Sequence, residues 1–115
     1  MWQVVYLDPV ADWLLELDDN AYQQFVACVE LLQELGPHLG RPLVDTIGHS
    51  SIRNLKELRV ASPGATEVRA LFVFDPQRQA VFVVIGDQRN NWKHWYAEAI
   101  PLAESRYLAY LTEGK

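Results

Sequence analysis

The stretch that decides the fold is NLKELRVASPGATEVRALFVFDPQRQAVFVVIGDQRNNWKHWY, residues 54–96. Two turn signals divide it, Ser-Pro-Gly at 62–64 and Asp-Pro-Gln-Arg at 75–78, and both are rich in the residue types that turns require. Apolar runs lie around these turns, and charged residues interrupt them at regular spacing. Because successive side chains of a strand point to opposite faces, the pattern predicts a small antiparallel sheet with charges gathered on one face.

The two turns also predict how the strands pair. Across the first turn Arg59 is expected opposite Glu67, and across the second Asp75 is expected opposite Gln79. The rest of the register follows from these two pairs: Glu57 with Arg69, Leu55 with Leu71, Ile85 with Arg69, and Val83 with Leu71.

Side-chain alternation gives the predicted sheet one apolar face and one divided face. Helices are expected to cover the apolar face, which carries Ile52, Leu58, Val68, Ala70, Phe72, Phe74, Phe82 and Val84. The divided face is apolar at one end, with Leu55, Leu71, Val73, Val81 and Val83, and charged at the other, with Glu57, Arg59, Glu67, Arg69 and Asp87. Lys56 falls on the apolar face, so it is expected at an edge or a bulge.

The charged end of the sheet is the best candidate site that the residues alone provide. Two interpretations stay open. Cross-strand ion pairs worth about 0.2–1 kcal/mol each would only fix the register. Alternatively, the carboxylates orient the guanidinium groups and leave their other donors for a phosphate.

The segments around the sheet are expected to be mostly helical, which makes the fold class α+β. Residues 3–7 predict a strand, and Asp8-Pro9 begins a helix with Asp8 as its N-cap. Asn20 is expected to cap a second helix that ends at Gly36-Pro37, which gives a helical hairpin. Residues 37–53 have no period and predict a surface loop, with a direct role for Arg41 or His49 as the alternative.

The C-terminal part predicts two more helices. A polar turn at 86–91 is followed by a short helix over 92–96, and Ile100-Pro101 starts the last helix. Trp92 and Trp95 are expected to pack on the sheet and bury a large area. The alternative is that they stack on bases, at about 1–3 kcal/mol per base.

Composition sets the class of protein. The 115 residues, 50% of them hydrophobic, fit a single domain over 1–115 with one core. The sequence shows neither a long apolar run nor a secretory leader, so we expect a soluble, cytoplasmic protein without a membrane segment. Cys28 lies in an apolar helical context and predicts a buried structural thiol. The sequence has no metal-ligand spacing and no phosphate-binding loop, so it predicts no metal, no nucleotide cofactor and no other cofactor.

The charge is unevenly distributed along the chain. The net charge is −5, yet residues 1–40 hold seven of the fifteen acidic residues and none of the ten Lys and Arg. Residues 41–115 therefore carry a small positive excess, which weakly favours a polyanionic partner for that part of the chain.

Several phrases of the sequence resemble one known family. They are GRPLVD (40–45), NLKELR (54–59), EVRALFVFD (67–75) and the WY…IP…A run (95–103). Together with the order of the expected elements, they are similar to the phage-derived HigB-like branch of the RelE/ParE toxins. The resemblance implies a RelE-like fold: an N-terminal strand and helical hairpin packed on an antiparallel meander, with C-terminal helices.

The resemblance also implies a function. Such proteins are toxins of type II toxin–antitoxin systems, and this branch implies a metal-independent endoribonuclease that cuts mRNA on the ribosome. A cognate antitoxin, often of the helix-turn-helix type, would neutralise it. Two other classes stay open: a ParE-like toxin that poisons gyrase by binding, and a non-catalytic regulatory domain that binds a partner.

Site residues are implied as well. The family's basic residues in the sheet match Arg69, Lys56 and Arg59, and the basic position after the last strand matches Arg89, with Gln88 as the alternative register. Near the C-terminus the aromatic or histidine position matches Tyr96, with His94 in support. The expected catalytic set is Arg69, Arg59, Lys56, Arg89, His94 and Tyr96, and the further residues expected to bind RNA are Lys93, Trp92, Trp95 and Arg53.

The sequence departs from the family pattern in two respects. Glu57 stands where RelE-like enzymes often carry a second lysine, and the chain is acidic overall. Both features weaken the expected attraction to ribosomal RNA and leave a member without activity as an alternative.

Overall fold

The computed structural model describes residues 1–60, 67–89 and 91–113. The described elements are β1 (Gln3–Tyr6), α1 (Asp8–Leu14), α2 (Asp19–Leu35), the 3-10 turn η1 (Gly36–His38), β2 (Val44–Thr46), β3 (Leu55–Arg59), β4 (Val68–Asp75), β5 (Gln79–Asp87) and α3 (Trp92–Thr112). None of the helices among these residues is both long and apolar enough to cross a bilayer.

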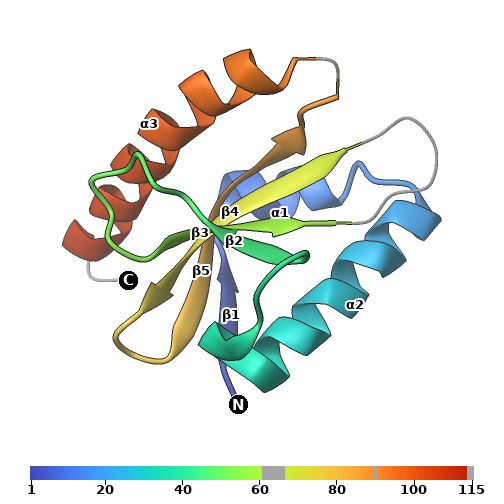
Figure 1. Ribbon diagram of the computed structural model, residues 1–115, viewed down its shortest axis with the longest axis horizontal. Helices are drawn as coiled ribbons and strands as arrows, with labels where there is room; N and C mark the ends of the chain where they lie inside the picture. Colours follow the sequence, from blue (N-terminus) through green and yellow to red (C-terminus); the bar gives the residue numbers. More distant parts are fainter. Residues whose placement is uncertain (61–66, 90, 114–115) are drawn as a thin grey trace.

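The strands form one five-stranded sheet in the order β1-β5-β4-β3-β2. Strand β1 lies parallel to β5 at one edge, and all other neighbours are antiparallel, with β2 at the opposite edge. Strands β3, β4 and β5 make the meander that the turns predicted (Figure 1). The α+β class is therefore confirmed, and β2 lies inside the segment that was expected to be only a loop.

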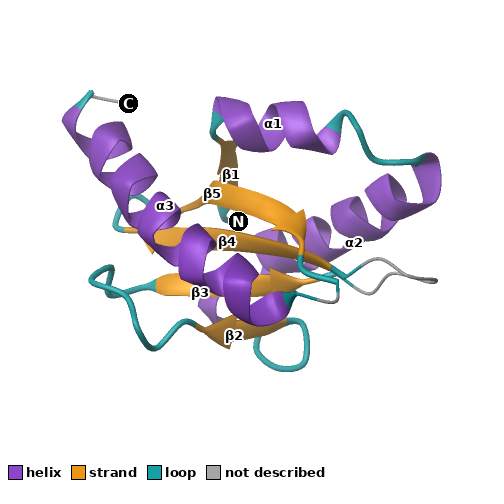
Figure 2. Ribbon diagram, turned by 90° about the horizontal axis from the view of Figure 1, so that it is seen from above, coloured by secondary structure: helices purple, strands orange, loops and turns teal. Residues whose placement is uncertain are grey.

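Helices cover both faces of this sheet (Figure 2). The hairpin of α1 and α2 packs on one face, where Phe25 of α2 meets a cluster of strand phenylalanines. Phe72 and Phe82 stack there at 5.0 Å between ring centroids. Helix α3 crosses the other face and sets Ala99 and Ala103 on the valines of β4 and β5. Small residues at these two positions let the helix approach the strands closely.

The observed register differs from the predicted one in the first hairpin. Arg59 lies opposite Arg69, not Glu67, so the whole β3–β4 pairing is shifted by two residues. A shift of two keeps every side chain on its predicted face. The turn signal at 62–64 lies outside the described residues.

The second hairpin begins as predicted, with Asp75 opposite Gln79, and then shifts at a bulge. The irregularity falls between Leu71 and Phe72, so Leu71 lies opposite Val84 and Arg69 opposite Gly86. A bulge adds one residue to a strand, and here both Val83 and Val84 pack under α3. Arg106 of α3 donates to the Val83 carbonyl at 2.8 Å. The placement of Ile52 and Val84 on the α1–α2 face was therefore wrong, since both contact the α3 side.

Helix boundaries correct three further expectations. Asp18, not Asn20, caps α2, because its carboxylate accepts from the Ala21 N–H at 2.8 Å. Asp8 is the first residue of α1 and Leu7 is its N-cap. The expected pair of C-terminal helices is one helix, α3, which continues through Pro101. An internal proline costs about 3 kcal/mol, and the packing of Ala99 and Ala103 on the sheet offsets that cost.

Glycine at position 86 is required by the close approach of α3. A Cβ built on Gly86 would stand 2.5 Å from Nε1 of Trp95, whereas one on Gly48 would meet nothing within 4 Å. We expect Gly86→Ala to lower the free energy of unfolding by about 1–3 kcal/mol, because the indole must move. The matched control Gly48→Ala should change it by less than about 0.5 kcal/mol. Urea denaturation measures both, and equal effects would contradict the packing of Trp95 on Gly86.

Candidate active site

A buried carboxylate, that of Glu57, stands at the centre of the charged end of the sheet. Glu57 lies on β3 and is only 3% exposed. Its Oε1 accepts from Nε of Arg59 at 2.8 Å, and its Oε2 accepts from the hydroxyl of Tyr96. Both contacts follow from the secondary structure. Residues 57 and 59 share one face of the strand, and the first turns of α3 bring Tyr96 over that face.

Arg59 is held by a second carboxylate from the edge strand. Its Nη2 lies 3.1 Å from Oδ2 of Asp45, whose Oδ1 lies 3.2 Å from Nε of Arg41. The hydrogen bond to Glu57 raises the pKa of Arg59, and the charge of Asp45 adds to this effect. The Arg59 side chain is still 38% exposed, so its outer donors can reach a ligand.

Arg69 lies beside this pair on the neighbouring strand. Its side chain is 16% exposed, its Nη1 donates to the Val68 carbonyl at 3.1 Å, and its Nη2 lies 3.9 Å from Oε1 of Glu67. The Gln88 amide, oriented so that its oxygen faces donors, accepts from Nε of Arg69 at 3.1 Å and donates to the Tyr96 hydroxyl at 3.2 Å. This orientation is assigned from the hydrogen-bond network. Gln88 thus joins Arg69 to Tyr96.

Tyr96 is kept protonated by its surroundings. Burial raises the pKa of its phenol most, and the hydrogen bond to the Glu57 carboxylate raises it further, while Arg69 and Arg59 oppose the shift. At neutral pH Tyr96 is therefore protonated and donates a hydrogen bond to Glu57. It does not ionise to the phenolate form that would serve as a base.

The comparisons with known proteins agree with this geometry. Residues 12–108 match the family described as phage-derived protein Gp49-like (DUF891). The chain belongs to the Gp49-like family. This membership confirms the predicted HigB-like branch of the RelE superfamily.

Two curated relatives of this Gp49-like chain are the candidate toxins HigB2 and HigB3 of Mycobacterium tuberculosis. HigB2 is 42% identical over 93% of the chain and 53% of its own length, and HigB3 is 43% identical over 90% of the chain and 88% of its own length. The chain therefore spans about half the length of HigB2.

Solved structures show the same fold at low identity. A free, doubly arginine-to-alanine mutated E. coli RelE toxin superposes with a TM-score of 0.64 at 10% identity, covering 87% of this chain and 95% of that one. A chain of the archaeal RelE–RelB complex from Pyrococcus horikoshii OT3 superposes with a TM-score of 0.56 at 16% identity, covering 76% of this chain and 94% of that one. These similarities confirm the predicted RelE-like fold.

The Gp49-like chain brings only part of the expected site together. Arg59, Arg69 and Tyr96 converge on Glu57 and Gln88, which we call the Glu57 cluster. Lys56 pairs with Thr46 and Phe72 and so lies on the opposite face, as the alternation predicted. Three other expected residues are exposed: Arg89 near Asp87 at 3.6 Å, His94 near Glu98 at 3.2 Å, and Arg53 in the loop before β3.

Three members of the site were missed or assigned another role. Glu57 was expected in the charged cluster as a partner of Arg69, but it was not in the catalytic set. Asp45 was not considered, and Gln88 was only the alternative to Arg89. Asp87 was expected on the charged face. It lies opposite Val68 instead, on the other face of the sheet, because the bulge changes the alternation of side chains along β5. One signal was present in the sequence: Glu57 and Arg59 stand two apart on one strand and must share a face.

Nothing in the Glu57 cluster resembles a metal centre. Across the described ranges, no three His, Cys, Asp or Glu side chains gather closely enough to hold a metal ion. The partly exposed guanidinium groups of Arg59 and Arg69 are hydrogen-bond donors that suit an anionic ligand such as a phosphodiester.

The two tryptophans at the start of α3 differ in burial. Trp95 packs over Gly86 and edge-on to Tyr96, at 5.0 Å between ring centroids. Trp92 is 57% exposed, with Nζ of Lys93 5.6 Å from the centre of its ring. The expectation that both pack on the sheet was therefore wrong for Trp92, whose position suits stacking on a base.

Replacing each tryptophan by alanine tests whether its side chain is packed or exposed. Trp95→Ala should lower the free energy of unfolding by about 2–3 kcal/mol, somewhat less than a fully buried aromatic would cost. Trp92→Ala should change it by less than about 0.5 kcal/mol. Thermal melts of both variants measure the difference, and a large loss for Trp92→Ala would show that its ring is packed in solution.

The raised pKa of Tyr96 makes stability depend on pH in the alkaline range. Tyrosines of the unfolded chain ionise near pH 10, whereas the folded protein holds the Tyr96 proton more tightly. This contribution is complete below about pH 10 and is lost as the pH rises through the higher pKa of the folded state. Between about pH 9 and 11, urea denaturation should show a less steep loss of stability in Tyr96→Phe than in the wild type. Identical slopes would mean that the Tyr96 proton is not held in the fold.

Proposed function

We propose that this chain is the toxin of a type II toxin–antitoxin pair and that the Glu57 cluster cleaves RNA without a metal ion. One observation carries the proposal: a single buried carboxylate holds the Tyr96 hydroxyl on one oxygen and Arg59 on the other, with Arg69 beside them. The Gp49-like membership and the candidate toxins HigB2 and HigB3 support the toxin assignment.

The two arginines would bind the reacting phosphate. Each guanidinium is fixed by protein acceptors, Arg59 by Glu57 and Asp45, and Arg69 by Gln88 and the Val68 carbonyl. Arginine has five N–H donors, so donors remain for the phosphate oxygens on the open side. Charge that builds up on phosphorus during cleavage would meet donors that are already in place.

Glu57 and Tyr96 would move the proton. The carboxylate is too deeply buried to meet the ribose directly, whereas Tyr96 is only half-buried. The 2′-hydroxyl would give its proton to the Tyr96 oxygen as Tyr96 passes its own proton to Oε2 of Glu57. The 2′-oxygen then attacks the adjacent phosphorus as the bond to the 5′-oxygen breaks, and the leaving 5′-oxygen would take a proton from water. The products are a 2′,3′-cyclic phosphate and a 5′-hydroxyl end, and Glu57 would return its proton to the solvent.

The substrate would be mRNA presented by the ribosome. A chain with a net charge of −5 attracts free RNA weakly, and a site with one buried base gains most when the substrate arrives already oriented. The exposed ring of Trp92 would stack on a neighbouring base. A cognate antitoxin, of the helix-turn-helix type, would neutralise the toxin in the cytoplasm.

Substitution within the Glu57 cluster tests the chemistry. Glu57→Gln keeps the shape but removes the proton acceptor, and should slow cleavage by about 10²–10⁴-fold. Arg69→Ala removes phosphate donors, and should slow it by about 10²–10³-fold. Both should relieve growth inhibition. Cleavage is followed on translating ribosomes with an end-labelled mRNA, and thermal melts confirm that each variant is folded.

Arg89→Ala is the matched control, because Arg89 is an exposed arginine outside the cluster. It should change the cleavage rate by less than about threefold, as expected when only a screened surface charge is lost. Full cleavage by folded Glu57→Gln would refute the proton relay. Toxicity without any RNA cleavage in the wild type would refute the nuclease and favour a toxin that acts by binding.

A further inference from the structure

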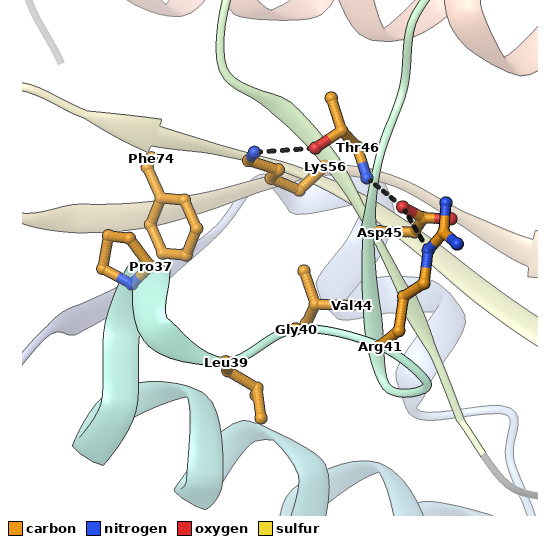
Figure 3. Close-up of a pocket in the computed structure, with 9 residues that line it drawn as sticks. All are labelled: Pro37, Leu39, Gly40, Arg41, Val44, Asp45, Thr46, Lys56 and Phe74. Atoms are coloured by element: carbon orange, nitrogen blue, oxygen red, sulfur yellow. Dashed lines mark hydrogen bonds and ion pairs between the residues drawn. The ribbon is translucent and has the colours of Figure 1, made fainter.

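A separate hollow lies on the other face of the sheet, between η1 and the edge strand β2 (Figure 3). Its volume is about 240 Å³. Apolar side chains line one part of it, those of Pro37, Leu39, Val44 and Phe74, and the polar residues Arg41, Asp45, Thr46 and Lys56 line the rest, with Gly40. The guanidinium of Arg41 turns away from it toward Asp45. We call this the Lys56 hollow.

Lys56 lines the hollow without forming an ion pair with any described carboxylate. Its Nζ donates to Oγ1 of Thr46 at 2.9 Å, and an ammonium group has three donors, so two are left over. Within the part of the chain that the structure describes, no carboxylate lies within ion-pair distance of Lys56, although Arg41, Arg59 and Arg69 each have one. A half-buried cation beside apolar walls favours an anionic group that also has an apolar part.

The size of the hollow indicates a single side chain as its ligand. Sites for small molecules and cofactors have volumes of about 300–1,000 Å³, and the Lys56 hollow is smaller than that range. A glutamate or aspartate side chain would place its methylene groups against Val44 and Phe74 and its carboxylate at Lys56. One buried anchor of this kind is the usual centre of a protein interface.

The edge strand β2 has no outward N–H group left to pair with an added strand. Within the sheet, β2 bonds β3 through the Leu43 carbonyl and the Ile47 N–H. The two N–H groups that point outward are already used: Val44 donates to the Gly40 carbonyl at 3.0 Å, and Thr46 donates to Oδ1 of Asp45 at 2.9 Å. A partner at this edge must therefore be recognised mainly by its side chains.

We propose that the Lys56 hollow is a docking site for the antitoxin, filled by a carboxylate side chain of the antitoxin that binds Lys56 and Thr46. This inference rests on the proposed function, since it supplies the place where the antitoxin binds. Asp45 connects the two sites, because the carboxylate that caps Thr46 N–H also holds Arg59 of the Glu57 cluster. The antitoxin would therefore bind the toxin at β2 without having to occupy the Glu57 cluster.

The experiment measures affinity for the proposed antitoxin, the product of the reading frame adjacent to this one, by calorimetry at low and high salt. Lys56→Met keeps the apolar stem and removes the charge, and should weaken binding about tenfold to a hundredfold, the range for a lost charged hydrogen bond. Lys56→Arg should bind within a few-fold of the wild type. Arg53→Ala, which removes an exposed cation elsewhere, is the control for general electrostatics and should change affinity by less than about threefold.

The outcomes separate this inference from the proposed function. Loss of affinity in Lys56→Met, with loss of most of the salt dependence, supports it. Unchanged affinity in Lys56→Met, or an equal loss in Arg53→Ala, overturns it, and so does failure of the wild-type chain to bind that protein. A raised KM for RNA with unchanged antitoxin affinity would assign the hollow to the RNA strand and overturn it too. If the wild type binds through Lys56 yet cleaves no RNA, the docking site stands and the nuclease fails.

Discussion

The buried carboxylate of Glu57 is the constraint around which the functional end of this protein is arranged. An ionised group removed from water costs several kcal/mol unless hydrogen bonds compensate it, and Glu57 obtains them from two different elements. Arg59 comes from the same strand, and Tyr96 comes from α3. The need to satisfy one carboxylate thus fixes where the start of α3 lies on the sheet, and Trp95 fills the space over Gly86 that this placement leaves.

The same constraint gives the site its chemical character. Position 57 of this chain is an acid, so a hydrogen-bond acceptor stands among the donors of Arg59, Arg69 and Tyr96. Tyr96 is held as a protonated donor, and the guanidinium groups of Arg59 and Arg69 are held by protein acceptors. Asp45 forms ion pairs with both Arg59 and Arg41, so the network of opposite charges reaches the edge of the sheet. The cluster is therefore pre-organised by ion pairs and hydrogen bonds whose members come from β2, β3, β4 and α3.

Sequence reasoning succeeded where the structure is determined locally. Asp75-Pro76 and Gln79 lie within one tight turn, and their pairing was predicted correctly. It failed where the determinant is distant. Val83 and Val84 are identical and apolar, so nothing in the alternation marks the bulge that shifts β5. Pro101 signals a helix break, yet packing on the sheet keeps α3 continuous.

The prediction of the site also succeeded for some residues and failed for others. Arg69, Arg59 and Tyr96 were expected from the resemblance, and the structure brings them together. Arg89 and Gln88 are adjacent in the chain, and only the shifted phase of β5 turns Gln88 inward and leaves Arg89 in solvent. Lys56 could be placed on the opposite face by alternation alone, and this placement argues against the catalytic role that the resemblance implied for it.

The most direct measurement is a crystal structure of this chain with an RNA that carries a 2′-O-methyl group at the cleaved position. The account predicts that the adjacent phosphate lies between the guanidinium groups of Arg59 and Arg69, with the 2′-oxygen within hydrogen-bond distance of the Tyr96 hydroxyl. RNA bound with its phosphate away from both arginines, or with its 2′-oxygen away from Tyr96, would contradict it.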